Sequence, residues 1–190
     1  MSILFINAAW RDKSRTERLA REYFALYPEV DCTEIKLGDM ASEVKPLNTD
    51  SLKVYNESVK KAAYDDRMFE FAKQFREFDE IVIAAPFWNF SIPALLHDYL
   101  ELVLTQGLSF DMGPDGRYVS LCKARRLVFI TTAGGHIPED NHAFMYIKNL
   151  CDVFWNISDV EYYKAEGLDI YGADVEQLLS DTVAIMRKNV

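Results

Sequence analysis

Five short segments rich in hydrophobic residues are spaced along the chain, at residues 2–8, 32–37, 81–85, 127–132 and 160–163. The first, third and fourth are nearly continuous hydrophobic runs, whereas the second alternates between hydrophobic and polar residues. Runs of this length are too short for typical helices, and continuous ones are typical of parallel strands that are covered on both faces. We therefore expect five strands, three of them deeply buried.

Between these segments, hydrophobic residues recur every three or four positions, which predicts amphipathic helices. The first helix carries on one face Leu19, Ala20, Tyr23, Phe24 and Tyr27. Further stripes predict helices over residues 52–63, 71–78, 95–103, 143–154 and 175–186. Residues 107–117 interrupt the alternation with a Gly-Pro-Asp-Gly turn at 113–116, in an excursion too long for a tight connection.

Alternating strands and helices predict a single α/β domain over residues 1–190, a three-layer sandwich around a five-stranded parallel sheet. Five strands favour the flavodoxin-like order 2-1-3-4-5. In such a sheet a ligand binds at the carboxyl ends of strands 1 and 3, where the winding reverses. The segments after Ala8, Ala85 and Thr132 are therefore the first places to look for a site.

The chain of 190 residues has 21 Lys and Arg against 30 Asp and Glu, a net charge of −9. An acidic protein lacks the positive field that attracts a phosphate backbone, so we expect no nucleic-acid partner. No hydrophobic stretch approaches the roughly 18 residues of a membrane-spanning helix, and no basic segment precedes the first strand, so we expect neither membrane insertion nor export. The three scattered cysteines suit a reducing compartment, which favours the cytoplasm.

Several common motifs are absent from the sequence. No Gly-x-Gly-x-x-Gly follows the first strand, which disfavours a Rossmann dinucleotide site, and no Walker A loop is present. The three histidines lack zinc-ligand spacing, so we expect no metal site. A serine hydrolase is disfavoured because there is no Gly-x-Ser-x-Gly elbow.

The segment after the first strand contains Ser14-Arg15-Thr16-Glu17 at the start of a helix. Ser14 and Glu17 fit a capping box, which stabilises a helix end. The same residues suit a monophosphate, because the Ser14 and Thr16 hydroxyls, free backbone N–H groups and the positive helix end all favour an anion. The two interpretations are compatible, and the residues alone leave both open.

The segment after the third strand contains three aromatic residues, Phe87, Trp88 and Phe90, between two prolines. Such a cluster can be a hydrophobic plug or a subunit contact. We favour a wall beside a planar ligand, with Asn89 and backbone N–H groups at its polar edge, because the prolines restrict the loop. Ser91 is the expected N-cap of the following helix.

The segment after the fourth strand is Thr131-Thr132-Ala133-Gly134-Gly135-His136. Its adjacent glycines permit close approach of the backbone to a flat ligand, although Gly-Gly is also common in ordinary turns. His136 could donate a proton or a hydrogen bond to such a ligand, but a partly exposed turn histidine is the simpler interpretation.

Together these segments resemble the FMN-dependent NAD(P)H azoreductases and quinone reductases of bacteria, which are flavodoxin-like homodimers. The resemblance runs from Ile3 to about Leu168, and its most specific part is Ile81-Val-Ile-Ala-Ala-Pro-Phe-Trp-Asn-Phe-Ser-Ile-Pro. Further matches are Thr105-Gln-Gly-Leu-Ser-Phe, Lys123, residues 132–135 and Ala165-Glu-Gly.

The resemblance implies FMN as the cofactor, NADH or NADPH as the reductant, and a quinone or azo compound as the two-electron acceptor of a ping-pong reaction. By the same resemblance, Ser14, Arg15 and Thr16 would hold the FMN phosphate, and the Asn89 N–H would lie near flavin N5. The ring system would be flanked by Pro86, Phe87, Trp88, Asn89, Phe90, Thr132, Ala133, Gly134 and Gly135. The substrate would meet Phe90, Phe110 and Met112.

The chain departs from the family pattern at several positions. Ala8 and Ala9 stand where family members often have serines, Phe87-Trp88 replaces the usual Met-Tyr, and Met112 replaces an aromatic residue. These departures leave the phosphate-binding helix end in place but alter the walls of the expected substrate pocket.

Other functions stay open on the sequence alone. They are a general NAD(P)H-dependent FMN reductase, an electron-carrier module that binds FMN without NAD(P)H turnover, and a phosphoesterase. The excursion at residues 107–117 opposes the electron carrier, because with Phe110 it suits a cover over a substrate pocket. The phosphoesterase ranks last, since neither a nucleophile nor metal ligands accompany the helix end.

Overall fold

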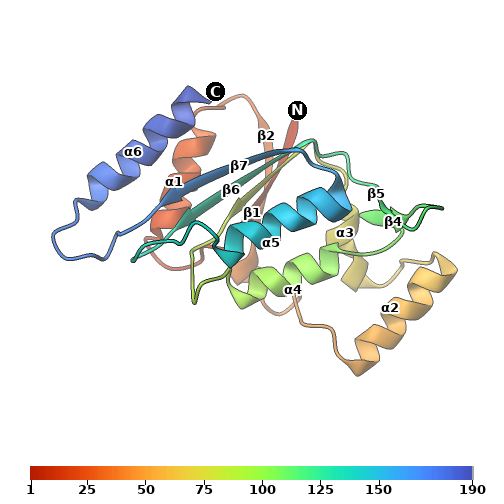
Figure 1. The fold of residues 1–190 in the computed structure, drawn as a ribbon. Coiled ribbons are helices and arrows are strands. Elements are labelled where there is room, and N and C mark those ends of the chain that lie inside the picture. The colour runs from red at the N-terminus through yellow and green to blue at the C-terminus, as the bar shows by residue number, and fades with distance from the viewer. Residues whose placement is uncertain (190) are drawn as a thin grey trace.

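Five parallel strands form the central sheet, in the order β2-β1-β3-β6-β7 (Figure 1). The computed structural model describes residues 1–189, and its sheet consists of β1 (Ser2–Asn7), β2 (Asp31–Lys36), β3 (Glu80–Ala84), β6 (Arg126–Thr132) and β7 (Asp159–Ala165). In chain order these strands have the predicted arrangement 2-1-3-4-5, so the flavodoxin-like fold is confirmed. Each strand lies within one or two residues of its expected bounds.

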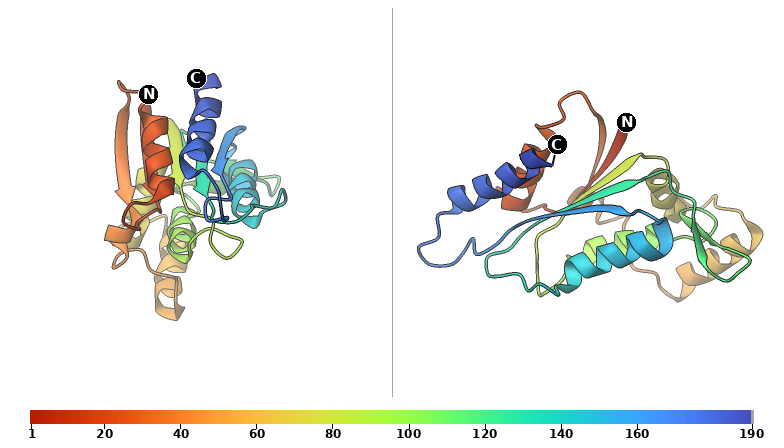
Figure 2. Two further views of the ribbon diagram at one scale, coloured as in Figure 1. Left: turned by 90° about the vertical axis from the view of Figure 1, so that its left-hand side faces the viewer. Right: turned by 45° about the horizontal axis from the view of Figure 1, so that its top comes forward.

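Helices cover both faces of the sheet and produce three layers (Figures 1 and 2). One face carries α1 (Arg15–Phe24) and α6 (Val175–Lys188), and the other carries α3 (Glu70–Phe75), α4 (Ala94–Val103) and α5 (His142–Leu150). Successive residues of a strand point to opposite faces, so β1 sends Ile3 and Phe5 into one core and Leu4 and Ile6 into the other. This two-sided burial explains why the strand is a continuous hydrophobic run.

Two further parts project from the three layers. α2 (Thr49–Lys61) contributes no buried residue and stands away from the sheet in Figure 1. β4 (Phe110–Met112) and β5 (Tyr118–Ser120) pair as an antiparallel hairpin, with the predicted turn between them. The chain after the hairpin runs along the amino ends of the central strands, because the Arg125 N–H donates to the Asp79 carbonyl directly before β3.

Cys122 and Cys151 belong to the hydrophobic core between the sheet and α3, α4 and α5. Burial raises the pKa of each thiol to about 12, so neither is ionised at neutral pH. Both cysteines therefore act as packing residues in this core.

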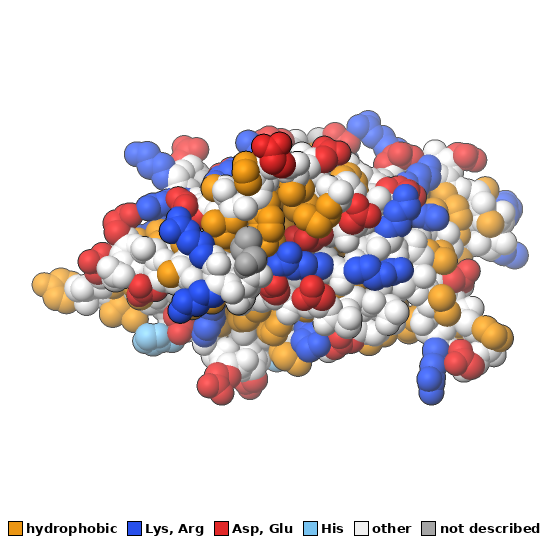
Figure 3. Space-filling model, turned by 90° about the horizontal axis from the view of Figure 1, so that it is seen from above, with side chains coloured by type: hydrophobic (Ala, Val, Ile, Leu, Met, Phe, Trp, Pro, Cys, Tyr) orange, Lys and Arg blue, Asp and Glu red, His pale blue; other side chains and the backbone are white. Residues whose placement is uncertain are grey.

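The surface mixes charges of both signs. Figure 3 shows Lys and Arg side chains interspersed with Asp and Glu over one face of the molecule, with smaller hydrophobic areas between them. Among residues 1–189, no helix combines the length and the apolar character needed to cross a membrane.

Candidate cofactor-binding site

A cleft of about 400 Å³ lies at the carboxyl ends of β1, β3 and β6. The segments that follow these strands, and the one that follows β7, form its walls. Nine of the twelve residues predicted to bind the cofactor line it: Ser14, Arg15, Thr16, Pro86, Phe87, Trp88, Thr132, Ala133 and Gly134. The fold therefore brings the three predicted segments together at the edge where the winding of the sheet reverses.

The first wall of the cleft is the amino end of α1. Ser14 is the N-cap, and its Oγ accepts the N–H of Glu17 at 3.3 Å. The Glu17 carboxylate does not complete the capping box, because it accepts hydrogen bonds from Asn7 and Arg21 instead. N–H groups in the first turn of a helix have no acceptor within the helix, so the Arg15 and Thr16 N–H groups can donate to an anion at this end of α1.

The Thr16 side chain is buried at the edge of the cleft and is bonded within the protein. The side chain is only 1% exposed, and its Oγ1 lies 2.6 Å from Oγ1 of Thr132. This hydrogen bond joins the start of α1 to the end of β6 across the cleft. The pair uses the proton of only one of the two hydroxyls, and the backbone N–H of Thr16 is a further donor at this end of α1.

Basic side chains concentrate at this end of the cleft. Arg11, Lys13 and Arg15 all line it, together with Asp12 and Asp169. Arg15 Nη1 lies 2.6 Å from Asp169 Oδ1. On a protein with a net charge of −9, a local excess of positive side chains beside a helix amino end favours an anionic group. Sequence reasoning missed Arg11 and Lys13, whose only signal was their position between the first strand and the first helix.

The second wall is the aromatic segment after β3. The Phe87 N–H donates to the Thr132 carbonyl at 2.9 Å, which ties the segment to β6. Trp88 and Ser91 exchange N–H···O bonds of 3.0 and 2.9 Å, which close a two-residue turn. Trp88 also packs edge-on against Trp10, with the ring centroids 5.7 Å apart. The aromatic segment is therefore held in place from both sides.

Asn89 and Phe90 form the tip of this turn and do not line the cleft. Their φ angles are 50° and 62°, and positive φ at both central residues is the mark of a type I′ turn. The expectation that Ser91 caps the next helix is wrong. Ser91 serves as the partner of Trp88 in the turn, and the residue that precedes α4 is Pro93.

The third wall is the turn after β6. A Cβ on Gly134 would lie 2.2 Å from Asp169 Oδ2, so the close approach of Asp169 requires glycine there. The Asp169 N–H donates to the Gly134 carbonyl at 2.9 Å. Gly135 and His136 are exposed and do not line the cleft. Asp169 follows β7, and no local sequence signal connected it with the other segments.

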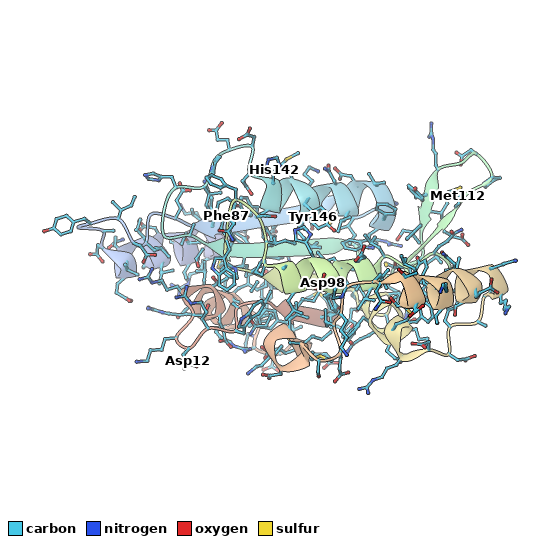
Figure 4. All side chains as sticks on the ribbon, turned by 90° about the horizontal axis from the view of Figure 1, so that it is seen from below. Asp12, Phe87, Asp98, Met112, His142 and Tyr146 are labelled. Atoms are coloured by element: carbon cyan, nitrogen blue, oxygen red, sulfur yellow. The ribbon has the colours of Figure 1, made fainter. Side chains whose placement is uncertain are left out.

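None of the three residues expected to meet the substrate lines the cleft of its own chain. Phe110 packs against Tyr118 and Phe154 beside the hairpin, with ring centroids 5.3 and 4.9 Å away. Figure 4 shows Met112 on the hairpin, well separated from Phe87. Phe90 lies two residues after Trp88, which lines the cleft, but Phe90 itself is 66% exposed.

Comparison with known proteins gives consistent matches over the whole length. The entire chain, residues 1–190, matches the protein family described as having a flavodoxin-like fold. An FMN-dependent NADH:quinone oxidoreductase of Coprothermobacter proteolyticus is 32% identical over 181 residues, which are 90% of this chain and 88% of that protein. A protein of the same name from Clostridium beijerinckii is 28% identical over 187 residues, 95% and 93% of the two chains.

A solved structure shares the fold. The crystal structure of an FMN-dependent NADH-azoreductase from Bacillus anthracis, in complex with FMN, has a TM-score of 0.81 at 22% identity, covering 100% of this chain and 97% of that chain. The whole-length family match and the relative at 32% identity extend the likeness from fold to family. The chain is an oxidoreductase that belongs to the flavodoxin-like family of FMN-dependent NADH:quinone oxidoreductases.

Proposed function

We propose that the protein holds FMN in this cleft and uses NADH to reduce quinones by two electrons. The observation that carries the proposal is the combination, in one cleft of about 400 Å³, of an anion-binding helix end and an aromatic wall. FMN has a phosphate at one end and a planar ring system at the other. The names of the relatives support the same cofactor and reductant. All three cysteines are free thiols, which supports a cytoplasmic location.

The side chains and backbone divide the work of binding. Ser14 Oγ, the first-turn N–H groups of α1 and Arg15 would hold the phosphate. Phe87, Trp88 and the backbone of residues 132–134 would flank the ring system. When bound, FMN would supply the hydride- and electron-transfer chemistry between NADH and the acceptor, and these residues would orient it.

We infer that NADH and the acceptor occupy the same open side of the cleft in turn, which is a ping-pong reaction. No dinucleotide motif follows β1, so the reductant has no separate binding segment there. The test varies NADH at several fixed concentrations of a quinone. Parallel double-reciprocal lines are expected, and lines that intersect would show that both substrates bind together.

The acceptor class needs its own comparison. We propose quinones as the principal acceptors, with azo compounds as a second class and NADH preferred over NADPH. Values of kcat/KM for a quinone, an azo dye and free FMN, each with both nicotinamides, decide this. A quinone or an azo dye is expected to exceed free FMN, and the opposite order would favour a general FMN reductase.

We further propose that two copies of the chain associate, so that the hairpin of one completes the pocket of the other. β4, which contains Phe110 and Met112, lies toward the amino ends of the central strands, whereas the cleft lies at their carboxyl ends. These two residues can reach a substrate only across a subunit boundary. Sedimentation should give twice the chain mass of 21.9 kDa, and a monomeric active enzyme would exclude this arrangement.

Replacing Trp88 by alanine should change the acceptor preference more than the fold. Trp88 lines the cleft, and aromatic contacts of this kind contribute about 0.5–1.5 kcal/mol, so the ratio of kcat/KM for quinone and azo dye should shift by about fivefold. Trp88→Phe is the matched control, since it keeps a ring in the wall. An unchanged ratio in Trp88→Ala would remove Trp88 from the acceptor side of the cleft.

A further inference from the structure

His97, on the first turns of α4, reaches back to the turn that carries the aromatic wall. Its Nε2 lies 3.3 Å from Ser91 Oγ, and its backbone N–H donates to the Pro93 carbonyl. His97 does not line the cleft, so its position gives it no direct contact with reactants there. Its contact is with the last residue of the Trp88–Ser91 turn.

The Trp88–Ser91 turn needs support from outside itself. Its central residues Asn89 and Phe90 both have positive φ, and a bulky residue such as Phe adopts that conformation at a cost of roughly 1–3 kcal/mol. Within the turn, only the paired backbone bonds between Trp88 and Ser91 oppose this cost. A side-chain bond to Ser91 from a helix adds an anchor that the turn does not possess by itself.

The anchor is itself fixed by the neighbouring helix. The His97 ring packs on Tyr146 of α5, with the ring centroids 4.8 Å apart and the planes inclined by 44°. Figure 4 shows Tyr146 between α5 and α4, on the side of Asp98. Phe87 lies near the amino ends of α4 and α5. The tyrosine limits the positions open to the imidazole, so that Nε2 stays directed at Ser91 Oγ.

We propose that His97 is a positioning residue: through Ser91 it holds the Trp88–Ser91 turn in the conformation that places the aromatic wall against FMN. The chain of contacts runs from Tyr146 to His97, then to Ser91, and through the paired backbone bonds to Trp88. This inference rests on the proposed placement of FMN. It adds a determinant of that site from outside the cleft, on a helix that does not line it.

The experiment compares the FMN dissociation constants of the full-length protein and of four variants: Ser91→Ala, His97→Phe, the double variant and His97→Gln. Phe keeps a ring against Tyr146 but cannot bond to Ser91, whereas Gln retains a polar end that can. Quenching of FMN fluorescence gives each dissociation constant, and the visible spectrum of bound FMN reports the surroundings of its ring. Thermal melting without FMN separates an effect on folding from an effect on the site.

Ser91→Ala and His97→Phe should each bind FMN about fivefold more weakly, the fold-change expected for one hydrogen bond of about 1 kcal/mol. The double variant Ser91→Ala/His97→Phe should bind FMN no more weakly than either of these single variants, because all three proteins lack the same hydrogen bond. His97→Gln should bind within about twofold of the unaltered protein, and the spectrum of bound FMN should shift only in the variants that lack the bond.

Unchanged affinity in Ser91→Ala or His97→Phe, or additive losses in the double variant, would overturn the positioning role. If His97→Phe and His97→Gln lose equal FMN affinity and show equal drops in melting temperature, His97 contributes to folding alone. If the unaltered protein binds no FMN, the proposed function fails and this inference fails with it. That outcome is distinct from a failure confined to the variants.

Discussion

Replacing Ser14 and Arg15 together by alanine should weaken FMN binding by about 100-fold. A hydrogen bond from an uncharged hydroxyl is worth about 1 kcal/mol and one from a charged group about 1.5–3 kcal/mol, and about 2.7 kcal/mol corresponds to a factor of 100. Both residues line the cleft at the amino end of α1. Thr16 is left out of this test, because its Oγ1 also joins α1 to β6 through Thr132, so its loss would change the walls of the cleft as well as any phosphate contact.

Arg18→Ala is the matched control for this variant. Arg18 lies on the same helix, but its guanidinium pairs with Glu176 of α6 at 2.6 Å and lies outside the cleft. Its loss should leave FMN affinity within about twofold. Because Ser14 is also an N-cap, the melting temperature of each variant is measured alongside. Equal affinity in the double variant and the unaltered protein would place the phosphate elsewhere.

Replacing Arg126 by alanine should lower the free energy of unfolding by about 3–5 kcal/mol, because it breaks a largely buried ion-pair cluster. Arg126 lies 2.6 Å from Glu161 Oε1 and 3.5 Å from Glu80 Oε2, with Asp159 at 3.7 Å. Glu80 is only 2% exposed, and the Tyr23 hydroxyl donates to it at 2.9 Å. Without the guanidinium, this carboxylate is left without its positive partner.

The pH dependence of this loss has a definite sign. Burial raises the pKa of Glu80 in the folded protein. The buried side chain therefore destabilises the fold at high pH, where it is ionised, and this cost is absent at low pH, where it is protonated. In Arg126→Ala the pKa should rise further. The difference in unfolding free energy between the variant and the unaltered protein should therefore be smaller at pH 5 than at pH 8.

Urea denaturation at the two pH values measures this difference. Glu80→Gln added to Arg126→Ala removes the buried charge while keeping an acceptor for Tyr23, and it should recover about half of the lost stability. A loss that is equal at pH 5 and pH 8, together with no recovery by glutamine, would show that the guanidinium acts mainly through packing.

The fold was predictable because each of its signals is local. Residues 3–6 are fully buried with side chains on both faces of the sheet, and a continuous hydrophobic run records this directly. Leu19 and Tyr23 recur one turn apart on the buried face of α1, which gives that helix its period. With strands and helices alternating, the rules of parallel sheets left few arrangements, and the observed order is the predicted one.

The predicted part of the cleft consists of residues that directly follow β3 and β6 and of those that begin α1. Asp169 reaches Gly134 from the segment after β7, and Thr16 reaches Thr132 across 116 positions of the chain. No local pattern reports such contacts. The Ser91 prediction failed because a serine before a helix has the same local appearance whether it caps the helix or closes a turn.

The most direct test of the central claim is an absorption spectrum of the purified protein with FMN, recorded without oxygen before and after adding NADH. We expect flavin bands that stay with the protein through gel filtration, bleach with NADH and return when a quinone is added. Flavin that stays bound but does not bleach would make the protein an electron carrier, and flavin that separates from the protein would show that this cleft binds something else.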